Sequence, residues 1–156
     1  MIQIDTREHA HAIRRILKTF DETGVEYFFS KLYVGDYQRL DNGLLVVDRK
    51  QNLAEIAGNL TQQHERFRSE LERAKKAKIR VVVLCEHGGQ IRSLEDVAEW
   101  KNPRLRELPQ AITGERMAKV MQTMSERYGV EWQFCDKRQT GRRIIEILKE
   151  GVDGEK

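Results

Sequence analysis

Two aspartates and a lysine lie at the ends of a short apolar segment. Asp36 opens the segment in VGDYQRL, and Asp48 and Lys50 close it in LLVVDRK, after eleven intervening residues. On a strand Asp48 and Lys50 project from one face and Arg49 from the other, because the side-chain period is two. Two carboxylates on one face suit a hard divalent cation such as Mg²⁺, which takes oxygen ligands. A neighbouring lysine can hold a phosphate or an attacking water, so the set favours metal-assisted phosphodiester hydrolysis.

A purely structural interpretation stays open for these residues alone. An Asp-x-Lys pair occurs by chance in many surface strands, where it forms a solvated ion pair at the end of a hairpin. Asp5 ends another short strand-like run, IQID, and Arg7 and Glu8 follow it; these residues are expected to bring two more carboxylates to the same sheet edge. So many charged groups in one place destabilise a fold unless they are paired or used.

Hydrophobic periodicity predicts the elements that hold these residues. Strands are expected in IQID, VEYFFSKLYV, DYQRL, LLVVDRK, IRVVVLCEH and VEWQFC, with a hairpin turn in the tripeptide DNG. Helices are expected over residues 8–24, 53–78, 93–100, 114–128 and 140–151, the second as one long helix with His64 on its apolar stripe. The run IRVVVLCEH is apolar on both faces, which indicates a central strand. The order predicts an α/β fold with a central mixed sheet and helices on both faces.

Composition limits the class of protein. The chain has 156 residues, which suits one domain over 1–150 followed by a flexible tail over 151–156. Charged residues make up 34% and the mean hydropathy is −0.66, so no membrane association is expected. The N-terminus lacks the layout of a signal peptide, and Cys85 and Cys135 are interpreted as free thiols of a cytoplasmic protein. The net charge of +3 leans toward anionic partners.

Three motifs in register resemble one family. The segments IDTRE, VGDY and VVDRKQNLAEI follow the order and spacing of V-D-x-R-E, G-D-Y or G-D-F, and E-R-K in the XPF/Mus-type structure-specific DNA endonucleases, of which the Hef-like nuclease domain is the most similar. The likeness continues through HERFRSEL, VVVLCEH and VEWQFCDKRQTGRRIIEIL, and is weakest over residues 88–112. It implies a restriction-endonuclease-like fold and hydrolysis of branched or flap DNA, in repair, recombination or phage DNA processing.

The resemblance also implies roles for single residues. Asp36 and Asp48 become metal ligands for Mg²⁺ or Mn²⁺, with the main-chain carbonyl of Arg49 completing the set. Lys50 orients the nucleophilic water or stabilises charge on the phosphate. In the same comparison, Asp5 and Glu8 support the metal site, and Arg7 and Arg49 contact phosphates or brace the carboxylates.

Two positions depart from the family pattern. Asp48 replaces the usual glutamate and is expected to be tolerated, because related sites accept either acid. Ala54 replaces an acidic residue found four positions after the lysine, and Glu55 is expected to point elsewhere on its helix. The departure at Ala54 puts the level of activity in question.

Partners follow from the same resemblance. Arg66, Arg68 and Lys75 lie on a basic helix face that is either a solvated surface or a track for DNA. The Met-rich helix over 114–128 and the strand VEWQFC are expected either to form a homodimer surface or to be internal. The chain is expected to be a nuclease core without the helix-hairpin-helix repeats of family members, so a DNA-binding partner subunit is a further expectation. The alternative function is a catalytically silent scaffold that binds DNA or pairs with an active subunit, and RNA is a more distant substrate.

Overall fold

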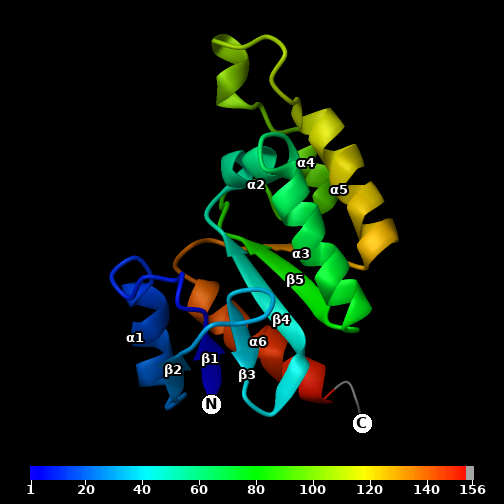
Figure 1. Ribbon diagram of the computed structural model, residues 1–156. Helices are drawn as coiled ribbons and strands as arrows, with labels where there is room; N and C mark the ends of the chain where they lie inside the picture. The colour runs from blue at the N-terminus through cyan, green and yellow to red at the C-terminus, as the bar shows by residue number, and fades with distance from the viewer. Residues whose placement is uncertain (154–156) are drawn as a thin grey trace.

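One mixed sheet organises the computed structural model, which describes residues 1–153 and the side-chain surroundings of residues 1–150. Its six strands run in the order β2-β1-β3-β4-β5-β6. Strand β3 is antiparallel to β1 and β4, whereas the pairs β1–β2, β4–β5 and β5–β6 are parallel. The strands are β1 (Ile2–Ile4), β2 (Tyr27–Phe29), β3 (Tyr37–Arg39), β4 (Asn42–Lys50), β5 (Arg80–Cys85) and β6 (Glu131–Phe134). The predicted α/β class with a mixed sheet, and the interior position of β5, are confirmed (Figure 1).

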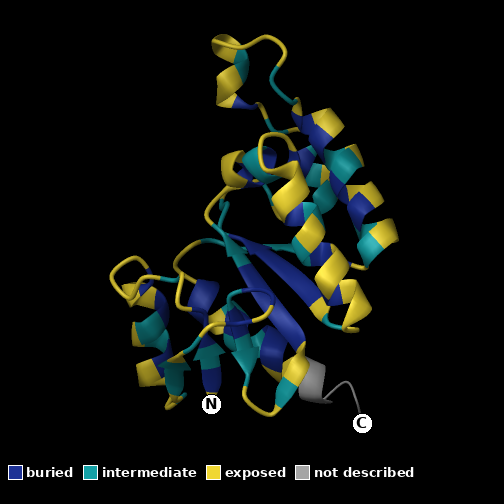
Figure 2. Ribbon diagram, viewed as in Figure 1, coloured by how far each residue is buried: buried dark blue, intermediate teal, exposed yellow. Residues whose placement is uncertain are grey.

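Helices cover both faces of this sheet. One face packs against α2 (Leu53–Leu60), α3 (His64–Lys76), α4 (Leu94–Val97) and α5 (Gly114–Tyr128). The other packs against α1 (Arg14–Glu22) and α6 (Thr140–Asp153), and a short 3-10 helix, η1 (Pro103–Arg106), lies in the loop before α5. Buried strands lie between the two helical layers (Figure 2).

Strand β4 contributes to both cores because its residues alternate between the faces. Val46 belongs to the core under α2 and α3, whereas Val47 belongs to the core under α1 and α6. The same alternation continues into the charged end of the strand. Asp48 and Lys50 therefore face α3, and Arg49 faces the α6 side, as the sequence predicts.

The single helix expected over 53–78 is wrong: it is two helices, α2 and α3. The amides of Thr61 and Gln63 both donate to the carbonyl of Gly58, and the Thr61 hydroxyl donates to the carbonyl of Ala57, which ends α2. The other residues of the predicted apolar stripe are buried in both helices. His64, predicted to be a core residue, is the first residue of α3 after the turn and is exposed.

Three boundaries also differ from expectation. The hairpin between β3 and β4 forms, but its turn is Leu40–Asp41, where the Arg39 guanidinium donates two hydrogen bonds to the Asp41 carboxylate. The strand expected over 25–34 is only β2, because the Leu32 amide donates to the Asp5 carboxylate instead of to a neighbouring strand. Helix α1 begins at Arg14 rather than Glu8, after a series of turns over residues 6–13.

The C-terminal boundary also differs from expectation. Helix α6 extends to Asp153 and so includes the first three residues of the expected tail, while residues 154–156 lie outside the described part. Within the described residues, the helices are too short or too polar to cross a bilayer. Cys85 and Cys135 are both free thiols, as predicted.

Candidate active site

The predicted site residues meet where β3 begins and β4 ends. The Asp36 amide donates to the carbonyl of Val47 at 2.9 Å, and the Arg49 amide donates to Oδ2 of the Asp36 carboxylate at 2.9 Å. Gly35 permits this close approach: its φ is +78°, and a Cβ there would lie 2.9 Å from the Val46 side chain. The glycine of VGDY is therefore needed to place Asp36 against β4.

A cleft of about 230 Å³ opens beside these residues, between the end of the sheet and helices α2 and α3. Phe67 and the side-chain amides of Asn59 and Gln63 form part of its wall. The charged residues that line it are Arg7, Glu8, Asp36, Asp48, Arg49, Lys50, Glu55, Arg66 and Glu70. Five of these nine side chains are acids and four are bases, so the cleft gathers carboxylates and cations together at one end of the sheet.

Asp48 lies close enough to Asp36 to disturb the ionisation of Asp36. Burial, and then the charge of Asp48, raise the pKa of Asp36 well above its ordinary value. The pKa of Glu70 is also raised, by burial first and by Asp48 second. Burial and the charge of Asp48 thus disfavour the ionised forms of Asp36 and Glu70, and a bound cation would relieve that repulsion.

Lys50 is the cation nearest this acidic group. Its Nζ lies 3.4 Å from Asp48 Oδ2 and 5.4 Å from the centre of the Phe67 ring. Burial lowers the pKa of Lys50, but the charges of Asp48, Glu55 and the other carboxylates outweigh it, so the net shift is upward. Lys50 is therefore an ammonium at neutral pH, able to donate hydrogen bonds but not to act as a base.

Arg49 lies on the opposite face, in a fully paired network. Its Nε and NH2 atoms donate to Glu8 at 2.7 and 3.1 Å, and NH1 donates to Glu86 at 2.5 Å. Tyr37 also donates to Glu8, and Thr140 to Glu86, each at 2.6 Å. Burial opposes the charged guanidinium, but Glu8 and then Glu86 raise the pKa of Arg49 overall. Glu86, which follows β5, is thus a structural partner of this arginine.

Asp5 is engaged away from the cleft. Its side chain is fully buried, Oδ1 accepts from the Leu32 amide at 2.8 Å, and Oδ2 accepts from the amide and Nε of Arg7. Burial favours the neutral acid, but these hydrogen bonds, led by that of Leu32, lower the pKa of Asp5 overall. The geometry makes Asp5 a brace for Arg7 and the loop over 30–36 rather than a wall of the cleft.

Two acids of the cleft were not predicted from the sequence: Glu70 was not identified, and Glu55 was expected to point away from the site. Glu70 on α3 accepts a hydrogen bond from the Gly35 amide at 3.2 Å, and so links that helix to the turn that carries Asp36. Its position four residues after Arg66, on the same helix face, was the available signal. The expectation that Glu55 points elsewhere is wrong, because it lines the cleft and accepts from the Gln51 amide at 2.8 Å.

The donor set fits a divalent cation. In the described part of the chain, no group of three or more His, Cys, Asp or Glu side chains is placed to hold a metal ion, so a cation here would need main-chain and water ligands besides the two aspartates. Asp36 and Asp48 nevertheless offer carboxylate oxygens whose mutual repulsion a cation relieves. The pairing of β3 with β4 ends at Tyr37 and Val47, so the Arg49 carbonyl has no partner on β3. It lies on the same edge of β4 as the Arg49 amide, which donates to Asp36. Two carboxylates, one carbonyl and water are the ligand types that Mg²⁺ accepts.

The four predicted DNA contacts do not form one track. Arg7 and Arg66 line the cleft. Arg68 forms ion pairs with Glu65 and Glu72 on its own helix and lines a separate groove. Lys75 donates to the carbonyl of Arg127 at 2.7 Å, which ties α3 to the end of α5.

Comparison with known proteins identifies the class. Residues 4–146 match the ERCC4 domain family, so the chain belongs to that family. The structure is similar to XPF from Aeropyrum pernix, with a TM-score of 0.67 and 20% identity over 97% of this chain and 64% of that chain. It is also similar to XPF from Aeropyrum pernix in a complex with DNA, with a TM-score of 0.64 and 18% identity over 98% of this chain and 65% of that one. No curated protein matches the chain significantly.

The predicted resemblance to XPF-type nucleases and the restriction-endonuclease-like expectation for the fold are therefore confirmed. The chain spans slightly less than two thirds of the XPF chains it matches.

Proposed function

We propose that this domain is a divalent-cation-dependent endonuclease that hydrolyses phosphodiester bonds of DNA, preferably at branched or flap structures. One observation carries the proposal: Asp36 and Asp48 converge in a cleft beside the ammonium group of Lys50. Membership of the ERCC4 family and the likeness to an XPF structure with DNA support DNA as the substrate. Roles in DNA repair or recombination, or in phage DNA processing, and a cytoplasmic location belong to the same proposal.

In this proposal Asp36, Asp48 and the Arg49 carbonyl hold Mg²⁺ or Mn²⁺. When bound, such a cation makes water a stronger acid and neutralises charge on the phosphate. Lys50 donates to the attacking water or to a phosphate oxygen, where its fixed charge stabilises the transition state. Arg7 and Arg66, which line the cleft, contact phosphates next to the scissile bond. Glu8 keeps Arg49 in place and thereby keeps the end of β4 rigid.

Cleavage of labelled DNA tests the proposal directly. Flap, forked and linear duplexes of equal length are incubated with the protein in Mg²⁺, in Mn²⁺ and in EDTA, with Asp48→Asn as the matched control. We expect products from the flap and fork in either metal, and none in EDTA or with Asp48→Asn. Equal products from the parent and Asp48→Asn would assign the activity to a contaminant and sink the proposal.

A silent scaffold is the second candidate, favoured by Ala54 at a position where the family usually carries an acid. Its signature in the same assay is binding of the flap without products in any metal. Glu55 lies in the cleft one residue further along α2, and its charge contributes to the raised pKa of Lys50. An acid is thus still present near the lysine, which supports the enzyme over the scaffold.

A homodimer and a DNA-binding partner subunit are kept as proposals. The three methionines of α5, Met117, Met121 and Met124, are buried in the core, so they do not form an exposed association surface. Strand β6 is an edge of the sheet, which leaves its outer edge free to pair with another chain. Light scattering at tens of micromolar tests the dimer, and a monomer mass would overturn it.

A further inference from the structure

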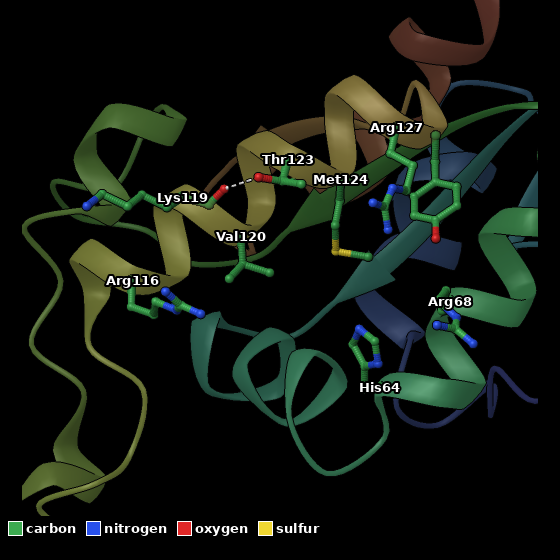
Figure 3. A pocket seen from close by; sticks show the side chains of 9 residues that line it. His64, Arg68, Arg116, Lys119, Val120, Thr123, Met124 and Arg127 are labelled. Atoms are coloured by element: carbon green, nitrogen blue, oxygen red, sulfur yellow. Dashed lines mark hydrogen bonds between the residues drawn. The ribbon is translucent and has the colours of Figure 1, made fainter.

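A second groove, about 310 Å³ in volume, lies between helices α3 and α5. We call it the α3–α5 groove. It shares no lining residue with the acidic cleft, although α3 borders both. In Figure 3, His64 and Arg68 of α3 and Arg116 and Arg127 of α5 extend toward the space between the helices, whereas Lys119 extends to one side. The groove is therefore bordered by cations from two elements far apart in sequence.

These cations lack local neutralisation on α5. Arg116, Lys119 and Arg127 recur at intervals of three and eight residues, so they lie along one side of the helix. Among residues 1–150, none of the three forms an ion pair with a carboxylate. Positive groups held along one groove repel each other, and an anion between them relieves that repulsion.

The α3 wall adds a fourth cation. The Arg68 NH2 atom lies 3.2 Å from Glu65, and its buried Nε atom lies 3.7 Å from Glu72, an ion pair too long for a hydrogen bond among the described residues. A closer acceptor, such as a phosphate oxygen, would supply the hydrogen bond that Nε lacks. Val120 and Met124 supply an apolar surface between the cationic rims.

The length of the groove indicates the kind of anion. Arg116 and Arg127 are eleven residues apart on α5, which corresponds to about 16 Å along the helix axis. One strand of duplex DNA carries one phosphate per about 3.4 Å of axis, and winding around the axis places successive phosphates farther apart than that, so the row is long enough for more than one phosphate. A single phosphate ion is too short to contact both ends. Repeated phosphates beside apolar side chains are what a nucleic-acid strand offers.

We propose that the α3–α5 groove binds the phosphodiester backbone of a nucleic-acid strand outside the cleavage cleft. This inference rests on the proposed function for the identity of the bound strand, which would be a second arm of the DNA being cut. Lys75 gives the groove a fixed shape, because its bond to the Arg127 carbonyl holds the end of α5 against α3. A chain that binds one arm here and another in the cleft prefers branched DNA to linear DNA.

Fluorescence anisotropy in EDTA tests binding without cleavage. The probes are a labelled single strand, a duplex of the same length, and a poly-glutamate peptide of similar charge. For Arg116→Ala/Arg127→Ala we expect an affinity loss of about tenfold or more, and a salt slope shallower by about 2, since two phosphate contacts are removed. The control, Lys18→Ala/Lys149→Ala, removes the same charge from exposed positions on α1 and α6 and should change affinity less than twofold. Arg116→Ala/Lys119→Ala serves as a second variant if the first proves unstable in a melting experiment.

Each outcome decides for or against the groove. Loss of binding to the single strand or to the duplex supports it, and the form that loses more identifies the bound strand. Parental affinity in both groove variants for both DNA forms overturns it. An equal loss of affinity for poly-glutamate also overturns the proposal, because it would indicate an acidic protein partner. A change of mass in light scattering without loss of DNA binding overturns it as well. The cleavage assay separates this inference from the proposed function. If the parent protein cuts no DNA but the groove variants still lose DNA binding, the groove proposal stands and the proposed nuclease activity is refuted.

Discussion

The two faces of β4 end in opposite electrostatic arrangements. On the α6 side, Arg49 lies between Glu8 and Glu86 with short hydrogen bonds to both. On the α3 side, Asp36, Asp48 and Glu70 share Lys50 as the one close buried cation among residues 1–150, and the pKa values of Asp36 and Glu70 are raised. Asp48, Arg49 and Lys50 are three consecutive residues of β4, so the difference comes from the surroundings of each face.

The comparison separates a brace from a reactive site. A paired network is stable as it is, and removing one partner leaves buried charges without compensation. A cluster with excess negative charge is unstable until a proton or cation arrives, which is common where stability is traded for activity. Residues of the first kind should govern folding, and residues of the second kind should govern metal binding and cleavage.

Loss of the central carboxylates should have the largest effect, and on cleavage alone. We expect Asp36→Asn and Asp48→Asn each to lower metal-dependent cleavage by roughly a thousandfold or more, because a ligand of the activating cation is lost. The melting temperature in EDTA should stay the same or rise, since the repulsion between the two acids is relieved. Early unfolding together with parental cleavage would instead mean that these acids only hold the hairpin.

Arg49→Met should show the reverse pattern. The change leaves Glu8 and Glu86 buried without their shared cation, at a cost of about 3–5 kcal/mol. The melting temperature should then fall by roughly 10 °C. Thermal unfolding followed by circular dichroism measures it, with Arg15→Met on exposed α1 as a control. A shift below 2 °C in Arg49→Met would show that the network contributes little to folding.

Lys50→Ala should lower cleavage by about a hundredfold while leaving metal binding intact, because its charge acts on water and phosphate. Isothermal titration with Mn²⁺ measures the metal, and single-turnover cleavage measures the reaction. If Mn²⁺ binding is lost together with cleavage, Lys50 acts by organising the carboxylates rather than by contacting the substrate.

The pH dependence of stability should distinguish the two faces most finely. Folding raises the pKa of Asp36, so the folded state holds its proton at pH values where the unfolded chain has lost it. In EDTA, stability should therefore fall as the pH rises from the ordinary carboxyl range through the raised pKa. Melting temperatures measured between pH 4 and 8 should show a smaller fall for Asp36→Asn than for the parent. Saturating Mg²⁺ should also reduce the fall, and an unchanged profile in both cases would contradict the shared acidic site.

The candidate ligands could be predicted because their relationship is local. Asp48 and Lys50 share a face through the period of a strand, and the turn between β3 and β4 returns the chain to Asp36. The α/β class with a mixed sheet was predictable for the same reason, because the apolar periodicities of strands and helices can be recognised within short segments. The break between α2 and α3 was not, because the apolar stripe continues across it and the hydrogen bonds to Gly58 end the helix.

What only the tertiary structure decided are the contacts between distant segments. Glu70 reaches Gly35 across 35 positions, Arg49 reaches Glu8 and Glu86 across 41 and 37, and the rims of the α3–α5 groove come from separate helices. The amino-acid sequence by itself determined which charged residues end each strand and which face each one takes. Whether an acid became a brace or part of the reactive cluster depended on the order of strands and the packing of α3 and α6. The strand order and the helix packing set the burial of each acid and the charges near it, and these two factors decide its pKa.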